Sequence, residues 1–63
     1  MSATASFEAK CTKETAAAIF VEVDGEEMWI PKSQVDDDSE VYGAGHEGKL
    51  VITEWIAKQK GIV

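Results

Sequence analysis

The first part of the chain alternates hydrophobic and polar residues with a period of two. Phe7, Ala9 and Cys11 are separated by charged or polar residues, a pattern typical of a strand with one face on a core and the other in water. After a polar break, a second alternating run is rich in β-branched residues, which favours a strand over a helix. We therefore predict strands near residues 6–12 and 16–23.

The dipeptide Asp24-Gly25 separates the second run from a third apolar segment. It predicts a hairpin with a type I′ turn, because both central residues of that turn need a positive φ. The partner strand is expected over residues 26–31. Pro31 has no N–H to donate to a neighbouring strand, so the third strand should end there or lie at a sheet edge.

A two-residue turn fixes which residues face each other across the hairpin. On one face Phe20 lies opposite Trp29. On the same face Glu22 lies opposite Glu27, where the two carboxylates repel each other modestly. The other face is apolar and is expected to contact the core; it carries Ile19, Val21, Met28 and Ile30.

The aromatic pair of Phe20 and Trp29 needs either a cover or a ligand. One alternative is that a C-terminal helix, or the closing of a barrel, buries the two rings. The other is an exposed platform that accepts a peptide, a protein partner or stacked bases. We expect partial burial, with the edge of the ring accessible.

The second half of the chain has shorter patterns. Residues 32–35 are expected to form a turn or a single 3₁₀ turn, and residues 36–40 a solvated acidic loop. A last strand is predicted over residues 49–52. Thr53 is well placed to cap a helix over residues 54–60, with a glycine next in the chain to end it.

These elements predict a mainly β (α+β) fold: a small curved sheet, or a partly open SH3-like barrel of four or five strands, with a short C-terminal helix. Trp55 and Ile56 are the expected anchors of the helix on the sheet. Residues 1–5 are expected to be disordered, and residues 6–63 to form a single small β domain. The residues expected in one core are Phe7, Ile19, Val21, Met28, Ile30, Leu50, Ile52 and Ile56.

The charge balance changes the choice of partner. Twelve acidic residues against six lysines, with no arginine, give a formal net charge of −6. A duplex-DNA binder draws most of its non-specific affinity from neutralising phosphates and most often contacts guanine with an arginine. The composition therefore disfavours double-stranded DNA. An acidic surface instead steers association with a basic partner.

The single cysteine, Cys11, leaves no intramolecular disulfide to form and indicates a reducing compartment. No secretory signal pattern opens the chain, and the longest apolar run, residues 16–21, is far shorter than a membrane span. We expect a cytoplasmic protein that does not enter a membrane and is present as a monomer or a homodimer.

Three groups that could carry chemistry have simpler explanations. His46, the only histidine, lies in a glycine-rich segment without an evident nucleophile to activate. Cys11 lies on the expected core face, where a thiol acts as a small hydrophobe. Asp36, Asp38 and Glu40 alternate as calcium ligands do, but the glycine and the final glutamate of a calcium loop are missing. We expect no enzymatic activity, no metal site and no cofactor.

Two blocks of sequence carry a resemblance: DGEEMWIPKSQ within residues 17–35, and EWIAKQKG at residues 54–61. Together they resemble a group of short uncharacterised proteins of bacteriophage and other mobile genetic elements, which implies a bacterial host cell and supplies no reaction, cofactor or catalytic residue. A weaker likeness to SH3-type barrels rests on Trp29-Ile30-Pro31 followed by a 3₁₀ turn and Val35. The aromatic peptide-binding motif of true SH3 domains is absent, so this likeness implies the fold alone.

The leading hypothesis is a non-catalytic accessory protein that binds a protein partner through Phe20, Trp29, Glu22 and Glu27. A first alternative is an inhibitor that mimics nucleic acid, which would need carboxylates along one continuous surface. A second alternative is a small barrel that binds single-stranded nucleic acid, which would need an electropositive groove leading to the aromatic pair. The lysines available for such a groove are Lys10, Lys13, Lys32 and Lys49.

Overall fold

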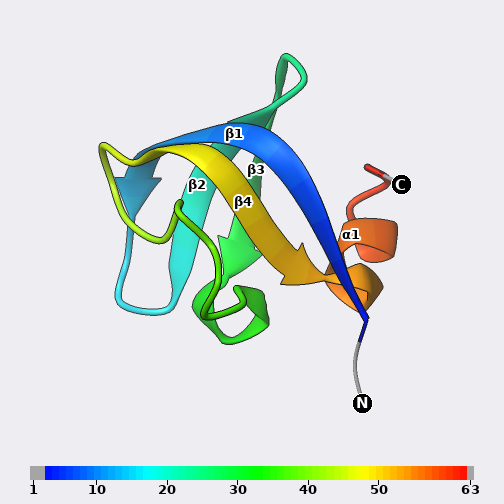
Figure 1. The fold of residues 1–63 in the computed structure, drawn as a ribbon. Coiled ribbons are helices and arrows are strands. Elements are labelled where there is room, and N and C mark those ends of the chain that lie inside the picture. The colour runs from blue at the N-terminus through cyan, green and yellow to red at the C-terminus, as the bar shows by residue number, and fades with distance from the viewer. Residues whose placement is uncertain (1–2, 63) are drawn as a thin grey trace.

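The computed structural model describes residues 3–62, which form a four-stranded antiparallel sheet and a short C-terminal helix (Figure 1). The expected mainly β class is confirmed, and each expected element is present with bounds within two residues of those predicted. The sheet stays open and does not close into a barrel. The elements along the chain are β1 (Thr4–Glu14), β2 (Ala18–Val23), β3 (Glu26–Pro31), η1, a 3₁₀ turn (Lys32–Gln34), β4 (Glu47–Thr53) and α1 (Glu54–Gln59).

The hairpin of β2 and β3 forms as its turn sequence predicts. Asp24 has a φ of 56° and Gly25 a φ of 83°, which are the two positive values that a type I′ turn needs. The register places Phe20 opposite Trp29, as expected from a two-residue turn. Local turn chemistry therefore sets the position of every side chain on this hairpin.

Replacing Gly25 with valine should lower the free energy of unfolding by more than about 1 kcal/mol. A β-branched residue strongly disfavours a positive φ. A Cβ at this position would meet no atom within 4 Å, so the cost comes from the backbone alone. Thermal unfolding followed by circular dichroism measures the change. The matched control is Gly25→Asn, because asparagine tolerates a positive φ; equal melting temperatures for the two variants would contradict the turn assignment.

Strand β1 is the longest strand and pairs with both β2 and β4, in the sheet order β3-β2-β1-β4. It begins at Thr4, which pairs with Thr53, and Ala5 pairs with Ile52. Residues 4 and 5 are therefore ordered, although we expected residues 1–5 to be disordered; residues 1 and 2 lie outside the described residues. The small, polar composition of this segment gives no sign of its pairing with a strand far along the chain.

The sheet buries its inner face against α1 and the segment that follows η1. Six of the expected core residues are confirmed there, whereas Phe7 and Met28 are only partly buried. Met28 lies on the edge strand β3, and Phe7 lines a hollow at the hairpin end of the sheet, so both mark the margin of the core. The buried cluster comprises Ala9, Cys11, Ile19, Val21, Val23, Ile30, Val41, Leu50, Ile52, Ile56 and Ala57.

Residues 35–46, which we call the edge loop, run along the outer edge of β4. Val35 forms an isolated bridge with Ile52. The N–H of Asp36 donates to the carbonyl of Val51 at 2.8 Å, and the N–H of Glu40 donates to the carbonyl of Lys49 at 2.8 Å. The acidic part of the loop is therefore tied to the sheet through its backbone, while most of its carboxylates face water.

Helix α1 begins at the expected cap, where Oγ1 of Thr53 accepts from the N–H of Ile56 at 3.3 Å. Ile56 and Ala57 are buried against the sheet, but Trp55 keeps 60% of its surface exposed. The expectation that Trp55 anchors the helix is wrong: successive residues on a helix point about 100° apart, and the neighbouring pair takes the inward face. No helix within residues 3–62 is long and apolar enough to cross a membrane.

Candidate functional site

Phe20 and Trp29 meet on the outer face of the β2–β3 hairpin, opposite each other in neighbouring strands. Their ring centroids are 4.9 Å apart and their planes are tilted by 49°, an arrangement within the range that aromatic pairs favour. Phe20 is partly buried, whereas Trp29 keeps 42% of its surface exposed. The pair is therefore partly buried with one ring accessible, as we expected.

A β-bulge extends this aromatic pair onto β1. The register between β1 and β2 shifts between Cys11 and Lys13, so Lys13 comes to lie opposite Phe20. The ammonium of Lys13 lies 5.4 Å from the centroid of the Phe20 ring, within the range of a cation–π contact. Lys13, Phe20 and Trp29 thus form one row across three strands. No sequence pattern predicts this contact, because period-two alternation contains nothing that locates a bulge.

The residues beside this row change from apolar to acidic along the hairpin. Ala18 pairs with Pro31 on one side of the aromatic pair, and Glu22 pairs with Glu27 on the other, next to the turn. Both glutamates are exposed. We call this surface the aromatic face; it comprises Lys13, Ala18, Phe20, Glu22, Glu27, Trp29 and Pro31.

No element within residues 3–62 covers the aromatic face. Helix α1 packs against β1 and β4, away from β3, and the open sheet supplies no further strand (Figure 1). Among the described side chains, Trp55 makes no aromatic contact with Trp29. The two covers considered from the sequence, the helix and a closing barrel, are thus both missing.

The chain matches no family model, no curated protein and no solved structure. What the aromatic face can bind therefore follows from its own geometry and charge. An exposed tryptophan held against a second ring is a rigid, amphipathic contact surface, and its indole N–H can donate to an acceptor. The adjacent glutamates add negative charge beside it.

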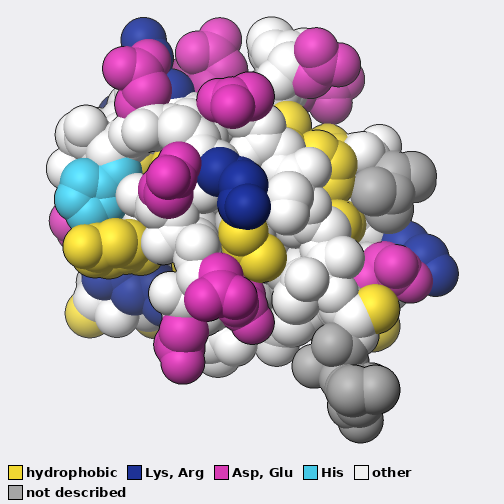
Figure 2. Space-filling model, in the orientation of Figure 1, with side chains coloured by type: hydrophobic (Ala, Val, Ile, Leu, Met, Phe, Trp, Pro, Cys, Tyr) yellow, Lys and Arg dark blue, Asp and Glu magenta, His cyan; other side chains and the backbone are white. Residues whose placement is uncertain are grey.

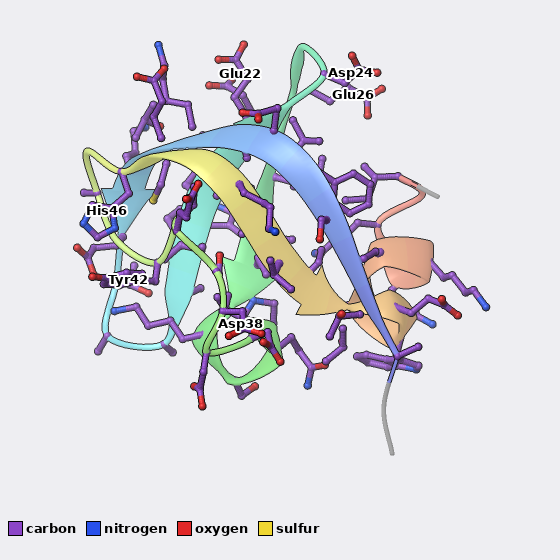
Figure 3. All side chains as sticks on the ribbon, viewed as in Figure 1. Glu22, Asp24, Glu26, Asp38, Tyr42 and His46 are labelled. Atoms are coloured by element: carbon purple, nitrogen blue, oxygen red, sulfur yellow. The ribbon has the colours of Figure 1, made fainter. Side chains whose placement is uncertain are left out.

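Cys11 and His46 are engaged in structural contacts. Cys11 is 1% exposed, its Sγ donates to the carbonyl of Lys13 at 3.1 Å, and burial raises the pKa of the thiol. A neutral, buried thiol is a poor nucleophile. The Nδ1 of His46 accepts from the N–H of Tyr42 at 3.3 Å, and the two rings meet edge to face with centroids 4.4 Å apart (Figure 3). Both side chains stabilise the edge loop and the end of β1.

Glu14 joins three segments at the end of β1. Its Oε2 lies 2.9 Å from the ammonium of Lys32 in η1, and its Oε1 accepts from the N–H of Ala44 in the edge loop at 3.0 Å. The hydrogen bond from Lys32, followed by the one from Ala44, lowers the pKa of the Glu14 carboxyl below its ordinary value. Glu14 and Lys32 therefore pair with each other and connect β1 to η1 and the edge loop.

The remaining carboxylates lie in separate groups. Glu22, Asp24 and Glu26 project at the turn of the hairpin, while Asp38 lies at the opposite end of the sheet (Figure 3), and Figure 2 shows acidic side chains in several separate groups on this face of the molecule. In the edge loop, carboxylates accept from nearby backbone N–H groups of Asp38 and Lys49. Within residues 3–62 no three His, Cys, Asp or Glu side chains are grouped so that they could hold a metal ion.

Proposed function

We propose that this chain is a non-catalytic accessory protein, of the phage or mobile-element type that its sequence resembles, which binds another protein through the aromatic face. The observation that carries the proposal is the uncovered Trp29, whose ring lies in tilted contact with that of Phe20. Tryptophan is enriched among the few residues that supply most of the binding energy of protein interfaces. The lone, buried thiol of Cys11 supports a reducing, cytoplasmic location.

The geometry of the aromatic pair favours binding, because little conformational freedom is lost when a partner binds. Trp29 contacts the cross-strand ring of Phe20, and the ammonium of Lys13 lies over that same ring. A side chain that is already ordered costs less entropy to immobilise at an interface. A flat apolar group of the partner can therefore displace water from the exposed ring at little conformational cost.

The charges around the pair favour a basic partner. Glu22 and Glu27 face each other across the hairpin, where like charges are destabilising. No lysine of the described residues forms an ion pair with either of them. A cationic side chain of the partner would relieve this repulsion, and the net charge of −6 would steer its approach.

A protein partner fits this surface better than nucleic acid does. A base stacked on Trp29 would bring its phosphates beside Glu22 and Glu27, and two of the four lysines considered for a groove, Lys10 and Lys32, already pair with glutamates. The separate groups of carboxylates in Figure 3 lack the continuous line that a nucleic-acid mimic needs.

Trp29→Ala should strongly weaken partner binding while the domain stays folded. The substitution removes a half-exposed cross-strand aromatic contact, so we expect a loss of stability of about 1 kcal/mol. Affinity should fall about 30-fold or more, the effect of losing one interface hot spot. Peptides selected with the wild-type chain from a random display library serve as ligands, and circular dichroism reports folding.

The matched control is Trp55→Ala, which removes an equally large and even more exposed ring from α1. It should leave the affinity for the selected peptides unchanged. The proposal fails if a folded Trp29→Ala variant binds these peptides as tightly as the wild-type chain does, if Trp55→Ala weakens binding to the same degree, or if the library yields no specific peptide.

A further inference from the structure

The two outer edges of the sheet differ in how they are covered. The edge of β4 is occupied by the edge loop, which bonds to the carbonyls of Lys49 and Val51 and, through Oγ of Ser39, to the N–H of Val51. Strand β3 pairs only with β2, and within residues 3–62 no segment bonds to its outer side. An unpaired strand edge is a template for another strand unless it is blocked.

The pairing of β3 with β2 determines which backbone groups of β3 point away from the sheet. A two-residue turn makes Val23 and Glu26 a hydrogen-bonded pair, and such pairs alternate along an antiparallel ladder. The bond from the N–H of Lys32 to the carbonyl of Ala17, at 2.8 Å, continues the same alternation at the other end of the hairpin. Two residues of β3, Glu27 and Trp29, therefore direct both N–H and carbonyl outward, away from β2.

We infer that β3 accepts an extended basic segment of the partner as an additional antiparallel strand, paired with Glu27 and Trp29. This inference rests on the proposed function and names the form in which the partner binds. Main-chain hydrogen bonds to the edge supply affinity that does not depend on sequence, and alternate side chains of the added strand supply specificity. Pro31 also lies at an outward position but has no N–H, so the pairing is short.

The register specifies the side chains of the added strand. The residue opposite Trp29 lies on the aromatic face, where an aromatic or large aliphatic group contacts the exposed indole. Two residues later the added strand lies opposite Glu27 on the same face, and the following residue lies opposite Glu26 on the inner side. Both of these positions favour lysine or arginine. The predicted segment thus reads aromatic, any residue, basic, basic.

A hollow of about 440 Å³ lies at this end of the sheet and suits the second basic residue. The residues that line it include the apolar Phe7, Val23 and Ile62 and the acidic Glu8, Asp24 and Glu26. The aliphatic stem of a lysine can lie along such a lining while its ammonium reaches the carboxylates. The hollow is continuous with β3, because Glu26 belongs to both.

Charge argues against a second copy of this chain as the occupant. Antiparallel pairing of two β3 strands through the outward residues would place Glu27 of each copy opposite Trp29 of the other, and Glu26 opposite Ile30. Neither glutamate would gain a basic partner, and each of the two chains carries a net charge of −6. Charged residues on an edge are a common device against self-association. The same charges attract a basic strand.

The test uses a short capped peptide with the predicted pattern, titrated into the full chain. At a free peptide concentration ten times its Kd, amide exchange at Glu27 and Trp29 should slow about tenfold, whereas Met28 and Ile30, already bonded to β2, should change little. Methylating the peptide nitrogen of its aromatic residue should weaken binding about tenfold, because that N–H faces the edge. Methylating the nitrogen of the next residue, which points away from the edge, should have no such effect.

The outcomes separate this inference from the proposed function. If Trp29→Ala abolishes binding but both methylated peptides bind equally and the two amides exchange as before, edge pairing is overturned and the aromatic face stands. If the peptide does not bind, or binds as well with glutamates in place of its lysines, the inference is overturned, and the display selection decides the proposed function separately. Protection of the same amides in a dimer without peptide would identify a second copy as the occupant and overturn it as well.

Discussion

Replacing Ser39 with alanine should lower the free energy of unfolding by about 2–4 kcal/mol, a large part of the stability of so small a domain. Ser39 is 7% exposed. Its Oγ accepts from the N–H of Val41 at 3.2 Å and of Val51 at 3.1 Å, and donates to the carbonyl of Val41 at 2.8 Å. Alanine would leave these buried backbone groups without that partner, which costs about 1–3 kcal/mol for each unsatisfied group.

Urea unfolding followed by circular dichroism measures this loss. Ser33→Ala is the control, because Ser33 lies exposed in η1, and a surface change of this kind stays within about 0.5 kcal/mol. A Ser39→Ala midpoint equal to that of Ser33→Ala would show that the hydroxyl does not hold the edge loop on β4.

Ile30→Ala should be similarly damaging, with a loss of about 2–5 kcal/mol. Ile30 has no exposed surface, lies on the inner face of β3 and pairs with the equally buried Ile19. Its truncation removes buried apolar surface and leaves a cavity in a thin core, so we expect the variant to be largely unfolded at room temperature.

Met28→Ala provides the comparison on the same strand and the same face, since Met28 is only partly buried. It should cost roughly half as much as Ile30→Ala, because less of its surface leaves water on folding. Equal losses for the two variants, measured by urea unfolding, would contradict the placement of Ile30 at the centre of the core and Met28 at its margin.

The hairpin and the helix ends could be predicted because short-range chemistry decides them. Asp24 and Gly25 accept the positive φ values of the turn, and that turn alone fixes the pairing of Phe20 with Trp29. Thr53 caps α1 through its own side chain. In each case the interacting residues are close in sequence or linked by one tight turn, so no knowledge of the rest of the fold is needed.

The edge loop could not be predicted because its partners are distant in sequence. Nothing around Ser39 indicates that its hydroxyl will accept from Val51, twelve residues later. In the sequence Val41 belongs to a short apolar pair, with Tyr42, next to a glycine, yet it is completely buried. Tertiary contacts of this kind override local composition, which for residues 36–40 indicates only a solvated loop.

The candidate site was predicted in part. The register identified Phe20, Trp29, Glu22 and Glu27 as neighbours on one face. Their exposure depends on which part of the sheet α1 covers, and that choice is made by Ile56 and Ala57 packing against distant strands. The contact of Lys13 with Phe20 depends on a bulge, and the availability of the β3 edge depends on the strand order; neither is encoded in a local pattern.

Because the lone thiol is buried, the rate at which a reagent alkylates it measures how often β1 opens. Cys11 is the single cysteine and lies in β1, one of the two inner strands of the sheet. Its N–H is bonded to the carbonyl of His46 and its carbonyl to the N–H of Gly45. An alkylating reagent can reach the sulfur only when β1 separates from its surroundings. When β1 recloses faster than the thiol is alkylated, the labelling rate of the folded chain divided by that of the unfolded chain equals the equilibrium constant for this opening. The measurement needs only native buffer and no substitution.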